Sequence, residues 1–338
     1  MRPSAALLTL LVLTAVASAN PTYLAEAPPA FRLGPVANGS VFFESLDEVR
    51  GDVVVLAFVR TACSGSRAAL PALERIREDN DRPDCHLLAT TCDSRTLVRR
   101  FLYHHPVGRK IDLPIACGSA GDWGVRRLPW AYVIGRDGKV AWAGHPGRGC
   151  GRAVDRALAA PEPGMPEAPA SCRKGLVHRQ ARHYAEALRA AESAMDRAGS
   201  ARFGKWLAEK VRSDFDRTLS PVIARLAEGD TYTAYESLRT ARERFRDTPH
   251  ELALLARLDA LARDEKARDA CSSWKLLWQV AAEAREEPEA ITSARCAKLR
   301  TLSKGGDERL AEAALELVHV LQTPWNAEDA ARVENLFR

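Results

Sequence analysis

The feature that most constrains the fold is a short apolar strand that runs into a cysteine. Val53–Phe58 is an apolar run rich in β-branched valine, which is typical of a strand buried in a parallel sheet. The run stops at Thr61, and a helix is predicted to begin with Cys63 in its first turn. Backbone N–H groups at a helix start are unpaired and carry partial positive charge, so a thiolate placed there is stabilised. The stretch therefore predicts a strand, a turn and a helix that presents a nucleophilic thiol.

Further signals follow the cysteine along the chain. Leu70–Leu73 lies on the predicted helix, Cys85–Thr91 indicates a second strand, and Pro114 opens a short apolar segment. The pair Asp137–Gly138 lies between two strand-like runs and predicts a hairpin. Leu128–Pro129 stands just before that hairpin, and an X-Pro bond adopts the cis form more readily than any other peptide bond. Together these signals indicate an α/β domain.

These residues resemble the TlpA-like (redoxin) branch of the thioredoxin superfamily, between Pro29 and Ala159. The resemblance implies an α/β thioredoxin-like fold, a central β-sheet flanked by helices, with a cis-proline at Pro129 facing Cys63. It also implies thiol–disulfide exchange on protein substrates, whose extended backbone would pair beside that proline. The family has a Cys-x-x-Cys site at this point, whereas Ser66 here makes it Cys-x-x-Ser. Ala62 stands where the family usually has tryptophan.

The missing second cysteine leaves the release step without a local thiol. A first thiolate attacks a disulfide to give a mixed disulfide, and a second thiol normally resolves it. Cys63 could make the attack and Ser66 could donate a hydrogen bond to its thiolate, but a hydroxyl cannot form a disulfide. Two other cysteines are candidates for resolving or bridging. Cys92 follows the second strand, whose end is expected at the same sheet edge as Cys63, and Cys117 follows the segment opened by Pro114.

Two alternatives stay open beside this catalytic hypothesis. A structural bridge between Cys92 and Cys117 is favoured over a catalytic role for them, and it requires Cα atoms within about 7 Å. Cys63 itself could be a relic in a non-catalytic binding module, with the C-terminal part of the chain recruiting a protein partner, because fold and function separate easily.

A peroxidase is the third alternative. Peroxiredoxins share the fold and resemble the pattern Pro-x-x-x-Thr/Ser-x-x-Cys. Counting back from Cys63, the threonine position holds Arg60 and the proline position holds Leu56, while Thr61 comes one place too late. Arg60 or Arg67 could still stabilise a thiolate by its charge, but the peroxide-binding pattern is missing.

Residues 1–19 have the three parts of a secretory signal peptide. Arg2 gives a basic start, Ala5–Ala15 a short apolar region, and Ala17–Ala19 a small-residue cleavage site. The apolar region is too short to span a bilayer. We therefore expect a mature chain that begins at Asn20, has no membrane span, and is periplasmic or extracellular. Disulfides persist in such compartments, so protein thiols or disulfides there are the expected partners.

Composition limits the other functional classes. The formal net charge of +5 is spread over interleaved acidic and basic residues without a basic run, which argues against nucleic-acid binding. The eight cysteines do not form paired Cys-x-x-Cys clusters, so no metal site and no cofactor is expected.

A chain of 338 residues with 46% hydrophobic residues is long enough for two domains. Residues 20–160 are predicted to form the TlpA-like domain, residues 161–170 a linker, and residues 171–338 an all-α domain. Four prolines favour extended structure in the linker, from which few contacts between the domains are expected. The rest is rich in helix-forming Ala, Leu, Arg and Glu. Helices are predicted over residues 173–197, 203–227 (bent or broken at Pro221), 231–245, 249–286 with one interruption, 288–302 and 307–321.

One internal similarity is visible in the helical part. Tyr184–Ala191 resembles Ala234–Ala241, and the shared Glu, Leu, Arg and Ala resemble one helix of a tetratricopeptide hairpin. The spacing is longer than the roughly 34 residues of that repeat, and no third copy is seen. Repeat ancestry therefore stays open, while helical hairpins packed in a small array are expected.

Overall fold

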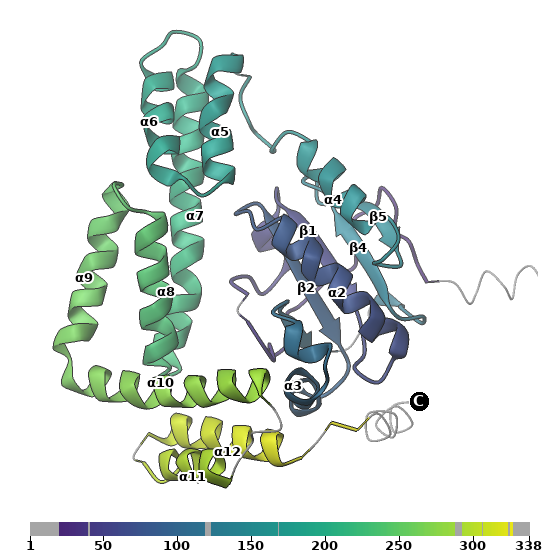
Figure 1. The fold of residues 1–338 in the computed structure, drawn as a ribbon. Helices are drawn as coiled ribbons and strands as arrows, with labels where there is room; N and C mark the ends of the chain where they lie inside the picture. Colours follow the sequence, from purple (N-terminus) through teal and green to yellow (C-terminus); the bar gives the residue numbers. More distant parts are fainter. Residues whose placement is uncertain are drawn as a thin grey trace, which may run out of the picture.

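The structure is a computed structural model that describes residues 20–39, 41–118, 123–167, 169–287, 293–305, 307–323 and 325–326. The predicted signal peptide lies outside the described residues. An α/β part and a helical part lie side by side (Figure 1).

The α/β part is built on a mixed sheet of five strands in the order β3-β2-β1-β4-β5. The central strand β1 (Val53–Phe58) pairs in parallel with β2 (Cys85–Thr91), which pairs in parallel with β3 (Ile115–Cys117). On its other side β1 pairs antiparallel with β4 (Trp130–Ile134), and the hairpin is completed by β5 (Val140–Gly144). This sheet with its flanking helices is a thioredoxin fold, which confirms the predicted fold class.

Each face of the sheet buries a separate apolar core. On one face, α2 (Ser64–Asp79), α3 (Arg95–His104) and α4 (Cys150–Ala159) pack on alternate residues of β1, because successive strand residues point to opposite faces. On the other face, the segment before β1 contributes Phe43 and the segment before β4 contributes Trp123. Short 3-10 helices are η1 (Leu46–Val49), η2 (Gly108–Lys110) and η4 (Ala170–Cys172).

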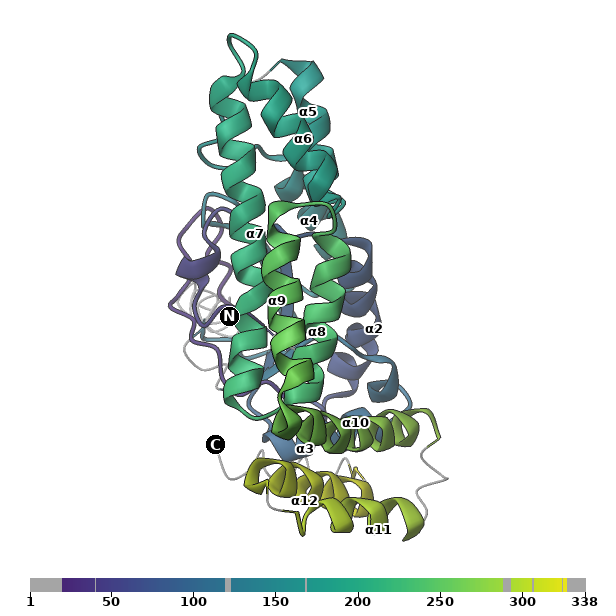
Figure 2. The same ribbon diagram turned by 90° about the vertical axis from the view of Figure 1, so that its left-hand side faces the viewer.

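The helical part is an array in which successive helices pack against one another. Figure 2 shows α7, α8 and α9 side by side in front of the α/β part, with α10 crossing at their lower end and α11 and α12 below it. None of the described helices combines the length and the apolar character needed to cross a membrane. The helices are α5 (Arg173–Gln180), α6 (Tyr184–Met195), α7 (Ala201–Ala227), α8 (Thr231–Arg244), α9 (Pro249–Arg263), α10 (Glu265–Glu286), α11 (Ser293–Leu302) and α12 (Glu308–Gln322).

Two helix predictions differ from the structure. The single helix predicted over residues 173–197 is wrong, because Arg182 adopts left-handed backbone (φ 59°) between α5 and α6. An ion pair of 2.7 Å between Arg182 and Asp81 of the α/β part accompanies this turn, and neither glycine nor proline marks it in the sequence. Helix α7 continues unbroken through Pro221, because the buried residues on either side of this proline, Leu219 and Val222, belong to the apolar core shared with α6 and α8.

Helix α12 packs along α3 and joins the two parts of the molecule. Arg99 of α3 forms an ion pair with Glu316 of α12, and His104 contacts the Val320 carbonyl at 2.7 Å through Nε2. Tyr103 of α3 packs into the apolar core of α10, α11 and α12. The helical part thus contributes directly to the surroundings of α3.

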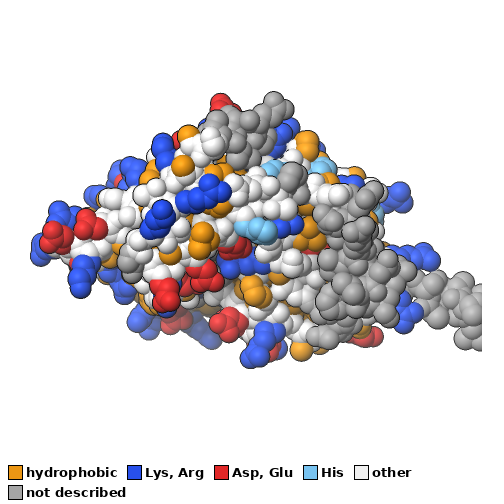
Figure 3. Space-filling model, turned by 90° about the horizontal axis from the view of Figure 1, so that it is seen from below, with side chains coloured by type: hydrophobic (Ala, Val, Ile, Leu, Met, Phe, Trp, Pro, Cys, Tyr) orange, Lys and Arg blue, Asp and Glu red, His pale blue; other side chains and the backbone are white. Residues whose placement is uncertain are grey.

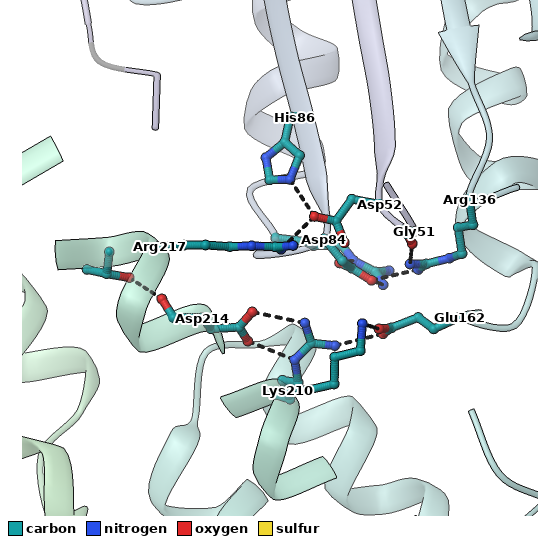
Figure 4. A network of polar contacts seen from close by, with 12 residues as sticks. Gly51, Asp52, Asp84, His86, Arg136, Glu162, Lys210, Asp214 and Arg217 are labelled. Carbon is teal, nitrogen blue, oxygen red and sulfur yellow. Dashed lines mark hydrogen bonds and ion pairs between the residues drawn. The ribbon is translucent and has the colours of Figure 1, made fainter. Parts of the chain in front are cut away.

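A second contact between the parts lies near the start of β1. Asp52 Oδ2 accepts a hydrogen bond of 2.6 Å from Arg217 of α7 and lies 2.9 Å from His86 Nε2 of β2 (Figure 4). Burial opposes ionisation of this carboxyl, but the contacts with His86 and Arg217 hold its pKa below the usual value. Beside it, Arg136 donates to Asp84 at 2.6 Å.

The predicted linker takes part in a buried ion cluster next to this contact. Arg179 of α5 donates to both carboxylate oxygens of Asp214 on α7, at 2.7 and 2.9 Å, and to Glu162 of the linker at 2.7 Å. Figure 4 labels Asp214, Glu162 and Lys210 of this cluster. The side chains of Arg179, Asp214 and Glu162 are each 1% exposed, and Lys210 lies 3.4 Å from Glu162. The expectation of few contacts between the domains is therefore wrong: Arg217 binds Asp52, Tyr103 packs among α10, α11 and α12, and a buried carboxylate fixes the linker itself. The boundaries of the two domains stay a prediction.

Candidate active site

Cys63 occupies the N-cap of α2, directly after the loop that leaves β1. Its backbone is extended, and its carbonyl accepts the Arg67 N–H at 3.0 Å. Its Sγ accepts a hydrogen bond from the Ser66 backbone N–H at 3.4 Å. The side chain is half-buried and is a free thiol. One of the unpaired N–H groups of the helix start is thus directed at the sulfur.

Ser66 contacts the sulfur through its backbone rather than through its hydroxyl. The side chain is completely buried, and its Oγ accepts the Arg60 backbone N–H at 3.1 Å. The predicted hydrogen bond from the hydroxyl to Cys63 is therefore replaced by one from the amide. The hydroxyl instead closes the turn between β1 and α2.

The loop before β4 faces the cysteine. The Leu128–Pro129 peptide bond is cis, as predicted, and Cys63 Sγ donates to the Leu128 carbonyl at 3.8 Å. Pro129 is buried against the first turn of α2. A Cβ added at Gly65 would lie 3.3 Å from Pro129 Cδ and 3.7 Å from Cys63 Sγ, so glycine permits this close approach.

Asp93 is a buried carboxylate at the site that the sequence analysis missed. It accepts hydrogen bonds from the backbone N–H and the hydroxyl of Thr61, both at 2.7 Å, and from Arg60 Nε at 3.2 Å. These bonds tie the loop after β2 to the loop that carries Cys63. The available signal was an acidic residue two places beyond the end of a predicted parallel strand, where site residues gather in α/β sheets.

Arg67 braces the same loop and connects it to the end of the helical part. Its Nη1 donates to the carbonyls of Thr61 and Ala62, at 2.7 and 2.8 Å. The guanidinium carbon lies 5.2 Å from the centre of the Trp325 ring, and that ring packs edge-on against His105 at 4.9 Å. No sequence pattern links Trp325 to the cysteine, because only the fold brings them together.

Both other candidate cysteines lie at the carboxyl ends of the parallel strands. Cys92 is exposed and immediately precedes Asp93, while Cys117 ends β3 with its backbone paired to Thr91. Burial raises the pKa of the Cys117 thiol to about 11. Cys117 is a free thiol here, and the alternatives of a bridge or a resolving role for these two residues stay predictions.

Two hollows of the surface, of about 390 and 680 Å³, both border Gly135, beyond the end of β4 that is remote from Pro129, and Cys63 lines neither of them. Within the described ranges, no group of three or more His, Cys, Asp or Glu side chains is arranged to hold a metal ion. On the face shown in Figure 3, basic and acidic side chains are interspersed with hydrophobic ones. Cys63 itself lies between the first turn of α2 and the loop before β4, close after the end of β1.

Comparison with known proteins gives one family match. Residues 27–143 match the model of the AhpC/TSA family, which covers the sheet as far as β5 and includes Cys63 and Pro129. No curated protein matched the chain.

Solved structures with similarity to the chain include three bacterial proteins. A putative thiol:disulfide interchange protein DsbE from Chlorobium tepidum is 20% identical over 39% of this chain and 100% of its own, with a TM-score of 0.31. A putative protein disulfide isomerase from Bacteroides thetaiotaomicron is 20% identical over 40% of this chain and 91% of its own, with a TM-score of 0.33. A thiol-disulfide isomerase from Corynebacterium glutamicum is 16% identical over 41% of this chain and 100% of its own, with a TM-score of 0.34.

Proposed function

We propose that this protein carries out thiol–disulfide exchange on exported proteins through a single nucleophilic cysteine, Cys63, in a Cys-x-x-Ser site. The single observation that carries this proposal is the position of Cys63 Sγ, between the first turn of α2 and the Leu128 carbonyl. A thiol at a helix N-terminus beside an accessible loop has the surroundings of a reactive cysteine.

The first step is an attack by Cys63 on a substrate disulfide. The Cys63 thiolate forms a new S–S bond with one substrate sulfur, the original S–S bond breaks, and the other sulfur leaves as a thiolate. The proton that Cys63 gives up is taken by the leaving sulfur. No net oxidation occurs, since one disulfide replaces another. The Leu128 backbone lies beside the reacting sulfur and would pair with the extended substrate.

The second step needs a thiol from outside the Cys-x-x-Ser motif. Ser66 cannot supply it, because its buried hydroxyl has no sulfur and is engaged with Arg60. Cys92 is the better candidate within the chain: it is exposed, and the next residue, Asp93, contacts the Cys63 loop. Cys117 is a poorer nucleophile at neutral pH because burial raises its pKa to about 11. If Cys92 attacks, a Cys63–Cys92 bridge forms and the substrate leaves as a thiol.

A peroxidase fits these contacts less well. In the peroxidase hypothesis the threonine near the cysteine would contact a peroxide, yet the Thr61 hydroxyl donates to the buried Asp93 at 2.7 Å. Thiol–disulfide exchange needs no such contact, because the atom that Cys63 attacks is a sulfur of the substrate disulfide.

The proposal is tested by trapping mixed disulfides in the exported fraction on non-reducing gels. Wild type is expected to show long-lived species, since the release step lacks a local thiol. They should vanish in Cys63→Ala and increase in Cys92→Ala if Cys92 resolves them. Identical gels for all three proteins would reject exchange chemistry and favour a binding module.

Export is tested by separating the cell fractions and sequencing the amino terminus of the protein in each. A chain that begins at Asn20 supports the predicted cleavage. A chain that retains residues 1–19 and stays in the cytosol contradicts it.

A further inference from the structure

The first described residue of the chain is fixed to the loop that leads to the cis-proline. Asn20 is only 6% exposed. Its Nδ2 donates to the Arg127 carbonyl at 2.7 Å, and its Oδ1 accepts the backbone N–H groups of Arg126 and Arg127, each at 2.8 Å. Donor and acceptor both meet a partner of the opposite kind, so the amide is held in one orientation.

This contact is adjacent to the candidate active site. Arg127 immediately precedes Leu128, whose carbonyl accepts from Cys63 Sγ at 3.8 Å. Because Asn20 binds both the N–H and the carbonyl of Arg127, it restricts the backbone that leads into Leu128. The same loop also contacts Gly65 of α2 through Pro129.

Asn20 is itself held by the hairpin. Tyr132 of β4 donates its hydroxyl to the Pro21 carbonyl at 2.7 Å. Farther along, Ala25 N–H donates to the Val140 carbonyl and Val140 N–H donates to the Glu26 carbonyl, both at 2.9 Å. The amino-terminal segment therefore lies along β4 and β5 and delivers Asn20 to one place.

We propose that Asn20 is a positioning residue for the Cys63 site: it holds the Leu128 backbone where an extended disulfide substrate pairs with it. This inference rests on the proposed exchange function. The inference also means that the position of signal-peptide cleavage decides whether this contact exists. Asn20 is the first residue left by the predicted cleavage, and a chain that starts one residue later, at Pro21, lacks the contact.

The test compares mature wild type with Asn20→Ala and with a chain that starts at Pro21. Two rate constants are measured at Cys63, one with a peptide disulfide and one with iodoacetamide. Both altered proteins are expected to react about tenfold more slowly with the peptide, because small displacements of a positioning group cost large factors in rate. Iodoacetamide needs no backbone pairing, and its rate should stay within about twofold of wild type.

Asn38→Ala is the matched control. Asn38 also binds backbone on both sides of its amide, to the Leu113 carbonyl at 2.7 Å and the Ile115 N–H at 3.1 Å, but at the start of β3. It should leave both rates at Cys63 unchanged. Equal losses in both rates for Asn20→Ala, or no loss in the peptide rate, would overturn the inference.

A readout without substrate separates this inference from the proposed function. Hydrogen exchange of the Arg126 and Arg127 amides should accelerate in Asn20→Ala and not in Asn38→Ala, since only the first removes their acceptor. Asn20→Asp, which keeps the acceptor oxygen, should protect them partly. If wild-type Cys63 does not react with the peptide disulfide while the hydrogen-exchange rates of the two amides change as expected, the proposed function fails and the structural role of Asn20 stands. Unchanged exchange would overturn that role.

Discussion

Replacing Ser66 with cysteine should convert the site into one that turns over. Residue 66 lies one helical turn from Cys63, and its backbone N–H already contacts Sγ at 3.4 Å, so a thiol there is a neighbour of the attacking sulfur. The substitution removes the acceptor of the Arg60 N–H in a completely buried position. We expect the free energy of unfolding to fall by about 1–2 kcal/mol, the cost of a buried N–H left with a weak acceptor.

Ser66→Ala is the matched control, because it loses the same acceptor and gains no thiol. The assay follows reduction of a peptide disulfide with a dithiol as the final reductant. Ser66→Cys should reduce the peptide faster, with repeated turnover, than wild type and Ser66→Ala, in which release depends on Cys92 or on the external dithiol. Equal rates for all three would refute the reasoning, since they would mean that the loops around Cys63 do not support the resolving step.

Three further predictions concern packing and protonation. Arg179→Met removes the buried partner of the Asp214 carboxylate and should cost about 3–5 kcal/mol in denaturant unfolding at neutral pH. Burial raises the pKa of Asp214, so the stability that its protonated form contributes is present at low pH and is lost as the pH rises. The stability difference between wild type and Arg179→Met should therefore shrink below about pH 5, and a constant difference would contradict this. A double-mutant cycle with Arg67→Ala and Trp325→Ala should give a coupling of about 0.5–1 kcal/mol, whereas strict additivity would exclude the contact. Burial raises the pKa of Cys150 to about 12 from an ordinary 9.0, so its thiolate is roughly a thousandfold scarcer, and it should be alkylated at neutral pH only after unfolding.

The α/β part could be predicted closely because its signals are local. The bounds of β2 are those expected from Cys85–Thr91, and the hairpin turns at the expected Asp137–Gly138. The strand and the hairpin depend on the preferences of neighbouring residues, which can be read from the sequence. The cis bond at Pro129 was expected from the resemblance of this Leu-Pro to the cis-proline of thioredoxin-like proteins.

The surroundings of the cysteine depend on distant residues, and most could not be predicted. Asp93, in the loop after β2, binds Thr61 in the loop after the neighbouring strand β1. Trp325, beyond α12 of the helical part, contacts Arg67 of α2. Asn20 was expected only as a new amino terminus, yet its amide binds the backbone before Leu128. Such contacts depend on tertiary packing, which leaves no periodic pattern in one sequence.

The same reason explains the error about the linker. Prolines favour extended backbone, and this preference does not reveal where a single side chain goes. Glu162 points into the cluster of Arg179 and Asp214, where its charge is paired and buried. One buried carboxylate was enough to join segments that composition alone separates.

The most direct test of the central claim is to identify the first cysteine that attacks a disulfide. The mature protein is mixed with excess peptide disulfide at neutral pH, quenched with acid after short times, and digested for mass spectrometry. We predict that the earliest peptide adduct lies on Cys63, at one equivalent per chain, before any adduct on Cys92. An adduct that appears first on Cys92, with Cys63 unmodified, would contradict the account.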